Sequence, residues 1–221
     1  MTALIRVHRK IESCNLCPRL REYCKTVAKI RRKAYAAEEY WGKPLKGFGD
    51  PAARLGVIGL APAAHGGNRT GRVFTGDRSA DWLYRALHKA GYSNQPISVS
   101  RDDGLKLKDA YVSCVVKCAP PDNKPLPDEL ERCSSHLKTE LAALERLEGF
   151  VVLGQIALHG LWASLGRGPR PKFSHLGQAE LPDGRWIVMS YHPSQQNTFT
   201  GRLTEPMLDA VFTETKRRLK R

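Results

Sequence analysis

The sequence lacks any stretch that approaches the ~18 consecutive apolar residues of a transmembrane helix. Its first residues contain no long apolar core followed by a cleavage site, so they do not resemble a secretory signal. Internal repeats and low-complexity linkers are also absent, and the 221 residues fit the size of one domain. We therefore expect a single domain over residues 1–221 that stays in the cytosol as a monomer and has no membrane partner.

Acidic residues are scarce relative to basic ones. The chain has 22 Asp and Glu against 36 Lys and Arg, which leaves a formal net charge of +14 at pH 7. A surface of this charge attracts polyanions well beyond contact distance, and nucleic acid is the first candidate partner. The alternative is a generally basic, thermally hardened surface, because charge alone does not identify a partner.

Two common nucleotide-binding signatures, GxGxxG and the Walker sequence, are missing, although the chain alternates buried strands with helices. Apolar runs with strand character are found around Leu55, Ala110, Phe150 and Trp186. Helical spacing of apolar residues separates these runs and predicts helices over residues 19–37, 79–90, 128–144, 156–165 and 207–219. The pattern indicates an α/β fold with a mainly parallel sheet that helices cover on both faces.

In such a sheet the ligand crevice lies outside the carboxyl ends of the strands, and two unusual loops are expected there. The first loop, residues 60–77, follows the first strand and combines glycines with cationic, aromatic and acidic side chains: His65, Gly66, Gly67, Asn68, Arg69, Arg72, Phe74 and Asp77. These groups suit an anion, a stacked base or a positioned charge. The alternatives are a plain connector, a phosphate cradle and, for Asp77, a helix cap.

The second loop, residues 192–204, follows the last strand directly, so the His192 imidazole should stand at the mouth of the crevice. The short polar side chains and the arginine after it suit contacts to DNA phosphates and groove edges; among them are Ser194, Asn197 and Arg202. A structural hydrogen-bonding role for His192 and a plain hydrophilic loop are the alternatives.

Six cysteines in a reducing compartment argue against a disulfide framework. Cys14 and Cys17 form a CxxC pair, and two more thiols lie far downstream, so four thiolates can complete a tetrahedral sulfur shell: Cys14, Cys17, Cys118 and Cys133. The spacing does not distinguish zinc from a [4Fe-4S] cluster, and buried unliganded cysteines are the third interpretation. The remaining two cysteines are interpreted as core residues: Cys24 and Cys114.

Together, GLAPAAHGGNRTGRVFTGD (residues 59–77), the four-cysteine layout and HPSQQNTFTGRLT (residues 192–204) closely resemble the family 5, or type-b, uracil-DNA glycosylases. The resemblance covers nearly the whole chain, and it is specific because three separated features agree in order and content. It implies a three-layer αβα sandwich around a four-stranded mainly parallel sheet, and excision of uracil from DNA. It also implies that the four cysteines hold a [4Fe-4S] cluster.

The resemblance assigns roles to individual residues. Asp77 would act as the catalytic carboxylate, because the wider superfamily places a polar residue directly after the proline, where this chain has Ala63. His192 would address the uracil O2 and Phe74 would stack on the flipped base, with backbone contacts from the first strand and loop: Gly59 and Ala61. We expect DNA contacts from both loops: Asn68, Arg72, Ser194, Asn197 and Arg202.

A second departure is Cys114, which stands where the iron-sulfur relatives of family 4 carry a base-reading Asn, so Asn123 is the candidate substitute. Hypoxanthine and ethenocytosine are further candidate bases, because Ala63 and Ala64 suggest a roomy pocket. No lysine is convincingly placed for a Schiff base, which favours a monofunctional enzyme. The rival hypotheses are a non-catalytic iron-sulfur protein that binds nucleic acid and a nucleotide-binding transferase.

Overall fold

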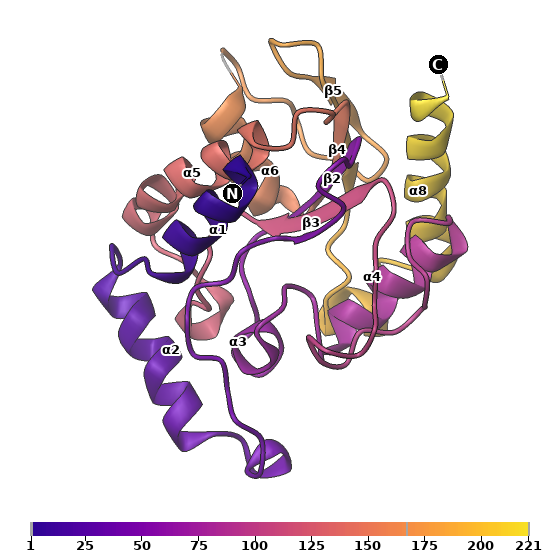
Figure 1. The fold of residues 1–221 in the computed structure, drawn as a ribbon. Coiled ribbons are helices and arrows are strands. Elements are labelled where there is room, and N and C mark those ends of the chain that lie inside the picture. Colours follow the sequence, from indigo (N-terminus) through magenta and orange to yellow (C-terminus); the bar gives the residue numbers. More distant parts are fainter. Residues whose placement is uncertain (1, 167, 221) are drawn as a thin grey trace.

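The computed structural model describes residues 2–166 and 168–220, which fold around a sheet in the order β1-β3-β2-β4-β6-β5 (Figure 1). The four central strands are parallel to one another: β3 (Ala110–Cys114), β2 (Leu55–Gly59), β4 (Gly149–Leu153) and β6 (Trp186–Ser190). Short antiparallel strands lie at the edges: β1 (Phe48–Gly49) and β5 (Gln178–Glu180). The expected four parallel strands are confirmed, and the sheet has two more strands, too short to leave an alternating pattern.

Successive side chains of the central strands point to opposite faces of the sheet. In β4, Phe150 and Val152 pack into one core, whereas Val151 and Leu153 pack into the other. Helices of the first face are α1 (Ala3–Glu12), α2 (Pro18–Ile30), α5 (Pro127–Ala142) and α6 (Gln155–Leu165). On the second face lie α4 (Arg78–Lys89) and α8 (Glu205–Leu219). The three-layer αβα sandwich is thereby confirmed (Figure 1).

At the N-terminal end, one predicted helix is too long and one helix was not predicted. The helix predicted over residues 19–37 ends at Ile30, because Arg31 has a φ of 58°, in the left-handed region that does not continue an α-helix. A 3₁₀ turn, η1 (Lys33–Tyr35), follows it. The first helix, α1, was not predicted, although its N-cap Thr2 accepts a hydrogen bond from the Ile5 backbone N–H.

The strand ends position the two loops of interest at one edge of the sheet. The chain leaves β2 into the 60–77 loop, which contains the short helix α3 (Gly67–Thr70), and it leaves β6 into the 192–204 loop, which contains α7 (Gln195–Phe199). Because β2 and β6 are parallel, both loops emerge at the same edge. No helix in the described ranges is long and apolar enough to cross a membrane.

Candidate active site and cysteine cavity

A cleft of about 570 Å³ opens at the carboxyl ends of the central strands. Both loops line it, together with the 3₁₀ turn η2 (Pro121–Asn123). Six of the predicted site residues meet there: Ala61, Phe74, Asp77, Asn123, His192 and Ser194. The lining also includes residues that sequence reasoning missed, among them Arg78 and Asp122, which carry no motif of their own.

Asp77 is the N-cap of α4, as one of the two interpretations of this residue predicted. Its Oδ1 accepts a hydrogen bond from the backbone N–H of Ala80 at 2.9 Å. Its Oδ2 lies against Gly66, where a Cβ atom would stand only 2.1 Å away. Burial raises the pKa of the Asp77 carboxyl, although the backbone N–H groups of Ala80 and Ser79 act in the opposite direction. Capping therefore holds the carboxylate in the cleft, and burial keeps it poorly solvated.

The ring of His192 lies 6.0 Å from that of Phe74, centroid to centroid, in the same cleft. Burial lowers the pKa of His192 to about 4, so its imidazole is neutral near pH 7. A neutral imidazole carries one N–H donor and one bare nitrogen. It can therefore donate a hydrogen bond to a developing negative charge without itself carrying a positive charge.

The ring of Phe74 lies over Gly59. The backbone φ of Phe74 is 47°, a value that is rare for a bulky residue. A Cβ atom at Gly59 would lie 2.5 Å from Cζ of Phe74, so the ring needs the glycine beneath it. The Gly59 carbonyl accepts a hydrogen bond from the Val115 backbone N–H at 2.9 Å. Gly59 therefore supports the aromatic ring, and its backbone contact to a base stays a prediction.

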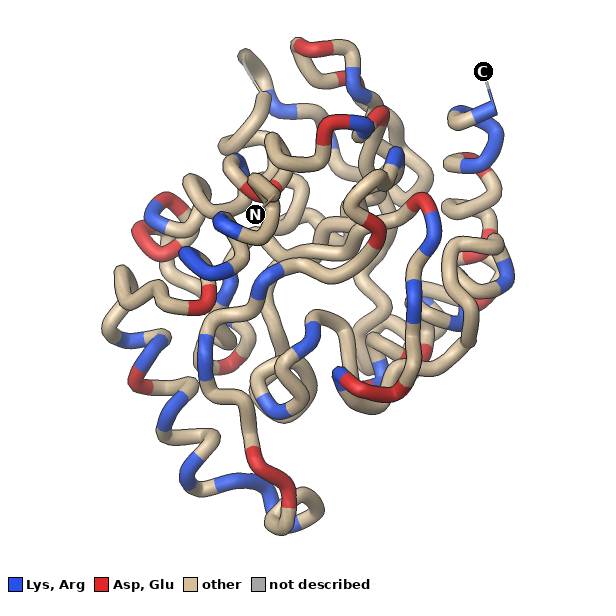
Figure 2. Tube along the Cα trace, in the orientation of Figure 1, with Lys and Arg blue, Asp and Glu red and all other residues tan. Residues whose placement is uncertain are grey.

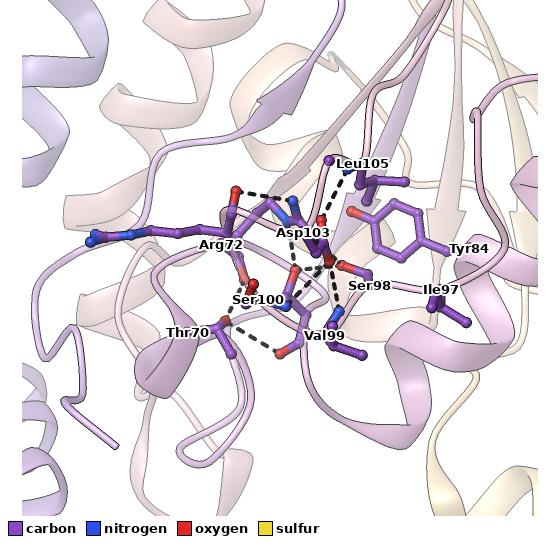
Figure 3. Close-up of polar contacts among 12 residues, drawn as sticks. Thr70, Arg72, Tyr84, Ile97, Ser98, Val99, Ser100, Asp103 and Leu105 are labelled. Carbon is purple, nitrogen blue, oxygen red and sulfur yellow. Dashed lines mark hydrogen bonds and ion pairs between the residues drawn. The ribbon is translucent and has the colours of Figure 1, made fainter. Parts of the chain in front are cut away.

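The prediction that Asn68 and Arg72 contact DNA is wrong, because both side chains are buried and used internally. Asn68 is fully buried, and its Nδ2 donates to the carbonyl of Cys24 at 3.4 Å. Arg72 is 4% exposed, and its Nη2 lies 2.7 Å from both Asp103 Oδ2 and Ser98 Oγ (Figure 3). These contacts brace the loop from within and leave no donor group for a phosphate.

The 192–204 loop is also braced by its own polar groups. Ser194 caps α7 by accepting a hydrogen bond from the Asn197 backbone N–H, and Asn197 Nδ2 donates to the carbonyl of His192 at 2.8 Å. Asn197 therefore holds the backbone that carries the His192 imidazole. Arg202 is exposed and stacks over Tyr191, with 4.7 Å from Cζ to the ring centroid, so it stays a predicted DNA contact.

All four cysteines of the predicted cluster site line one small cavity: Cys14, Cys17, Cys118 and Cys133. The Lys117 backbone N–H donates to the Cys133 sulfur at 3.3 Å, and Nη1 of Arg21 lies 3.9 Å from the Cys118 sulfur. Two buried nitrogens of the cavity wall have no hydrogen-bond partner within the described chain, Nε of Arg21 and Nε2 of His136. A donor and a cation directed at two of the four thiols fit an anionic group held by thiolates.

The spacing of the thiols bears on the kind of metal group. Within the described residues, no three His, Cys, Asp or Glu side chains come close enough to hold one metal ion. The other two cysteines are buried in the two cores as predicted, Cys24 in α2 and Cys114 in β3, where burial raises the pKa of Cys114 to about 12.

A sequence model of the uracil DNA glycosylase superfamily matches residues 46–216, which include both loops of the cleft. The chain belongs to this superfamily. It is 48% identical over 208 residues to the type-5 uracil-DNA glycosylase of Thermus thermophilus, with 94% of each chain covered. It is 47% identical over 212 residues to the type-5 uracil-DNA glycosylase of Mycobacterium tuberculosis, which covers 94% of this chain and 78% of that one.

More distant similarity extends to another type of the same superfamily. The type-4 uracil-DNA glycosylase of Thermotoga maritima is 28% identical over 153 residues, 67% of this chain and 68% of that one. The much higher identity to type-5 proteins confirms the branch that the motifs predicted.

Proposed function

We propose that this protein excises uracil from DNA by hydrolysing the bond between the base and its deoxyribose. The observation that carries the proposal is the cleft in which Asp77, His192 and Phe74 meet at the carboxyl ends of β2 and β6. A base stacked in a duplex is out of reach, so the nucleotide must flip into this cleft at a cost of about a few kcal/mol. The formal charge of +14 favours the DNA contacts that offset this cost.

Cleavage of the glycosidic bond builds positive charge on the sugar and negative charge on the departing uracil. The ionised Asp77 carboxylate stabilises the sugar cation and orients the attacking water, by the logic of glycoside hydrolysis. His192, neutral because burial lowers its pKa to about 4, donates a hydrogen bond to the uracil O2 as charge develops there. The two groups therefore serve opposite ends of the breaking bond.

Phe74 stacks on the flipped base, while Ala61 and Asn123 line the cleft around its edge. The small side chains of Ala63 and Ala64 favour acceptance of larger bases such as hypoxanthine or ethenocytosine. Within the described residues, no lysine lines the cleft, which favours a monofunctional hydrolase that leaves an abasic site.

We further propose that Cys14, Cys17, Cys118 and Cys133 hold a [4Fe-4S] cluster. Its role is structural, since it would tie the turn before α2 to the start of α5 and to the segment after β3. Iron and acid-labile sulfide should each approach about four per chain, the composition of such a cluster. Stoichiometric zinc would overturn this part of the proposal.

The function is tested by release of free uracil from a duplex that carries one uracil. The wild-type protein should release the base and leave the strand intact until alkali is added. Asp77→Asn and His192→Ala should each lower the single-turnover rate by about 10²-fold or more, the effect of losing one transition-state contact. DNA affinity should persist in both variants. Absence of base release from every uracil duplex by the wild-type protein would support a non-catalytic binding protein instead.

A further inference from the structure

A groove of about 520 Å³ leaves the cleft and runs toward α2. It shares Asp77, Arg78 and Asn123 with the cleft, so it opens directly from the position of the flipped base. Its far wall carries Arg32 and Tyr35, which belong to the segment that follows α2. We call α2 and this segment, residues 18–41, the arm; α2 lies at the lower left of Figure 1.

The arm carries exposed cations in excess. Lys25, Lys29, Arg32 and Lys33 are all exposed, and α2 and the turn after it show a run of basic positions in Figure 2. In the part of the chain that the structure describes, none of these four takes part in an ion pair. Their charges are therefore not neutralised within the protein and are open to an anion.

Contacts to the 60–77 loop hold the arm in place. The Arg69 guanidinium stacks on Tyr35 at 3.9 Å and pairs with Glu38 at 2.5 Å. The Tyr40 hydroxyl lies 3.0 Å from Nδ1 of His65 and accepts a hydrogen bond from the Arg32 backbone N–H at 3.3 Å. Because the same loop carries Asp77, the cations of the arm are held in a fixed relation to the cleft.

We propose that this groove binds the sugar–phosphate backbone of the target strand on one side of the flipped nucleotide, with phosphate contacts from Lys29, Arg32 and Lys33. The strand that leaves a nucleotide seated in the cleft must pass an opening of the cleft. Arg32 lines this groove, and Lys29 and Lys33 are exposed on the same arm, so the three cations suit the phosphates of a backbone that follows the groove. The proposal rests on the proposed function, since it places the flipped base in the cleft.

The C-terminal basic run provides a matched control, because it lies at the other end of the sheet. The Leu219 carbonyl accepts a hydrogen bond from Nη1 of Arg54, the residue directly before β2. Lys106 and Lys108, which precede β3, lie at that same amino end. Three exposed cations of this end are Lys106, Lys108 and Lys220.

The experiment compares two triple variants that lose the same charge. The test variant is Lys29→Ala/Arg32→Ala/Lys33→Ala, and the control is Lys106→Ala/Lys108→Ala/Lys220→Ala. Single-turnover excision on a uracil duplex is measured from about 50 to 200 mM salt to give the half-saturating protein concentration and the maximal rate. The test variant should flatten the salt dependence of log affinity by about 2 to 3 units of slope, one per lost phosphate contact, with an unchanged maximal rate.

The side of the contact is tested with two duplexes, one truncated 5′ and one truncated 3′ of the uracil. The difference between wild type and test variant should disappear with one of the two truncations only. Equal salt slopes for the test and control variants, or loss of the difference with both truncations or with neither, would overturn the proposal. DNA affinity is also measured by fluorescence anisotropy, which does not depend on excision. A wild-type protein that binds DNA through the arm but releases no uracil would refute the proposed function and leave the proposed DNA contact standing.

Discussion

Replacing Gly66 with alanine should displace the Asp77 carboxylate, the proposed catalytic group, while leaving the fold in place. The added Cβ would stand 2.1 Å from Oδ2 and 2.9 Å from Cγ of Asp77, where ordinary contacts begin near 3.4 Å. The carboxylate must therefore retreat by more than about 1 Å, and a misplacement of this size costs about 10²-fold in rate. Loss of the capping bond to Ala80 adds about 1 kcal/mol of destabilisation.

The assay is single-turnover release of uracil, followed together with thermal unfolding and DNA affinity. A control is Gly184→Ala in the β5–β6 hairpin, where a Cβ meets open space but the φ of 85° is unfavourable for alanine. The control should lose stability and keep the excision rate. The expected loss is about 10²-fold in the rate of uracil release. If the folded Gly66→Ala variant instead releases uracil at a rate within about twofold of wild type, the role assigned to the position of the Asp77 carboxylate is refuted.

Three further predictions follow from buried charged groups and the cysteine cavity. Burial raises the pKa of Asp77, and the proposed mechanism requires its ionised form. As the pH is lowered, the excision rate should therefore begin to fall at a higher pH than it would with a solvated Asp. The variant Asp77→Asn keeps the helix cap and removes the desolvated charge, so it should raise the melting temperature at alkaline pH while abolishing most activity. Arg72→Met leaves the Asp103 carboxyl buried without its partner and should cost about 3–5 kcal/mol in urea unfolding, against less than about 0.5 kcal/mol for exposed Arg202→Met. Removal of iron by chelation under oxidising conditions should lower the melting temperature, and a melting temperature insensitive to iron would contradict a structural cluster.

The Arg72 network also has a pH dependence of known sign. Burial alone would raise the pKa of Asp103, but the Arg72 guanidinium and backbone N–H groups, including that of Leu105, lower it to about 2. A carboxyl group whose pKa is lowered by folding stabilises the protein above its unfolded pKa. That contribution is lost as the pH falls toward 2.

Much of the fold could be predicted from the sequence because buried strands and amphipathic helices leave periodic patterns. Those patterns located the four central strands and the helices after them, and strand ends then placed His192 and the 60–77 loop at one crevice. The edge strand β1 was missed because its two residues show no period. The end of α2 was missed because Arg31 is no typical left-handed residue.

The DNA contacts of the first loop could not be predicted, because residue type does not reveal which cations are buried. The partner of Arg72 is Asp103, 31 positions further along the chain, and only the folded structure brings them together. Lys117 is another example: it follows a strand and precedes Cys118, yet its Nζ is buried 2.5 Å from Glu140 Oε2. In contrast, the sequence correctly grouped the four cysteines that line one cavity, because metal ligation constrains residue type as well as position.

The double duty of Asp77, as helix cap and as the carboxylate of the cleft, shapes how this protein can evolve. Asparagine caps a helix about as well as aspartate, so one substitution can silence the chemistry without a penalty in folding. Selection for stability alone does not protect the carboxylate, and only selection for activity retains it. Without selection for activity, a descendant of this protein would keep a stable, basic αβα domain that still binds DNA but no longer excises the base.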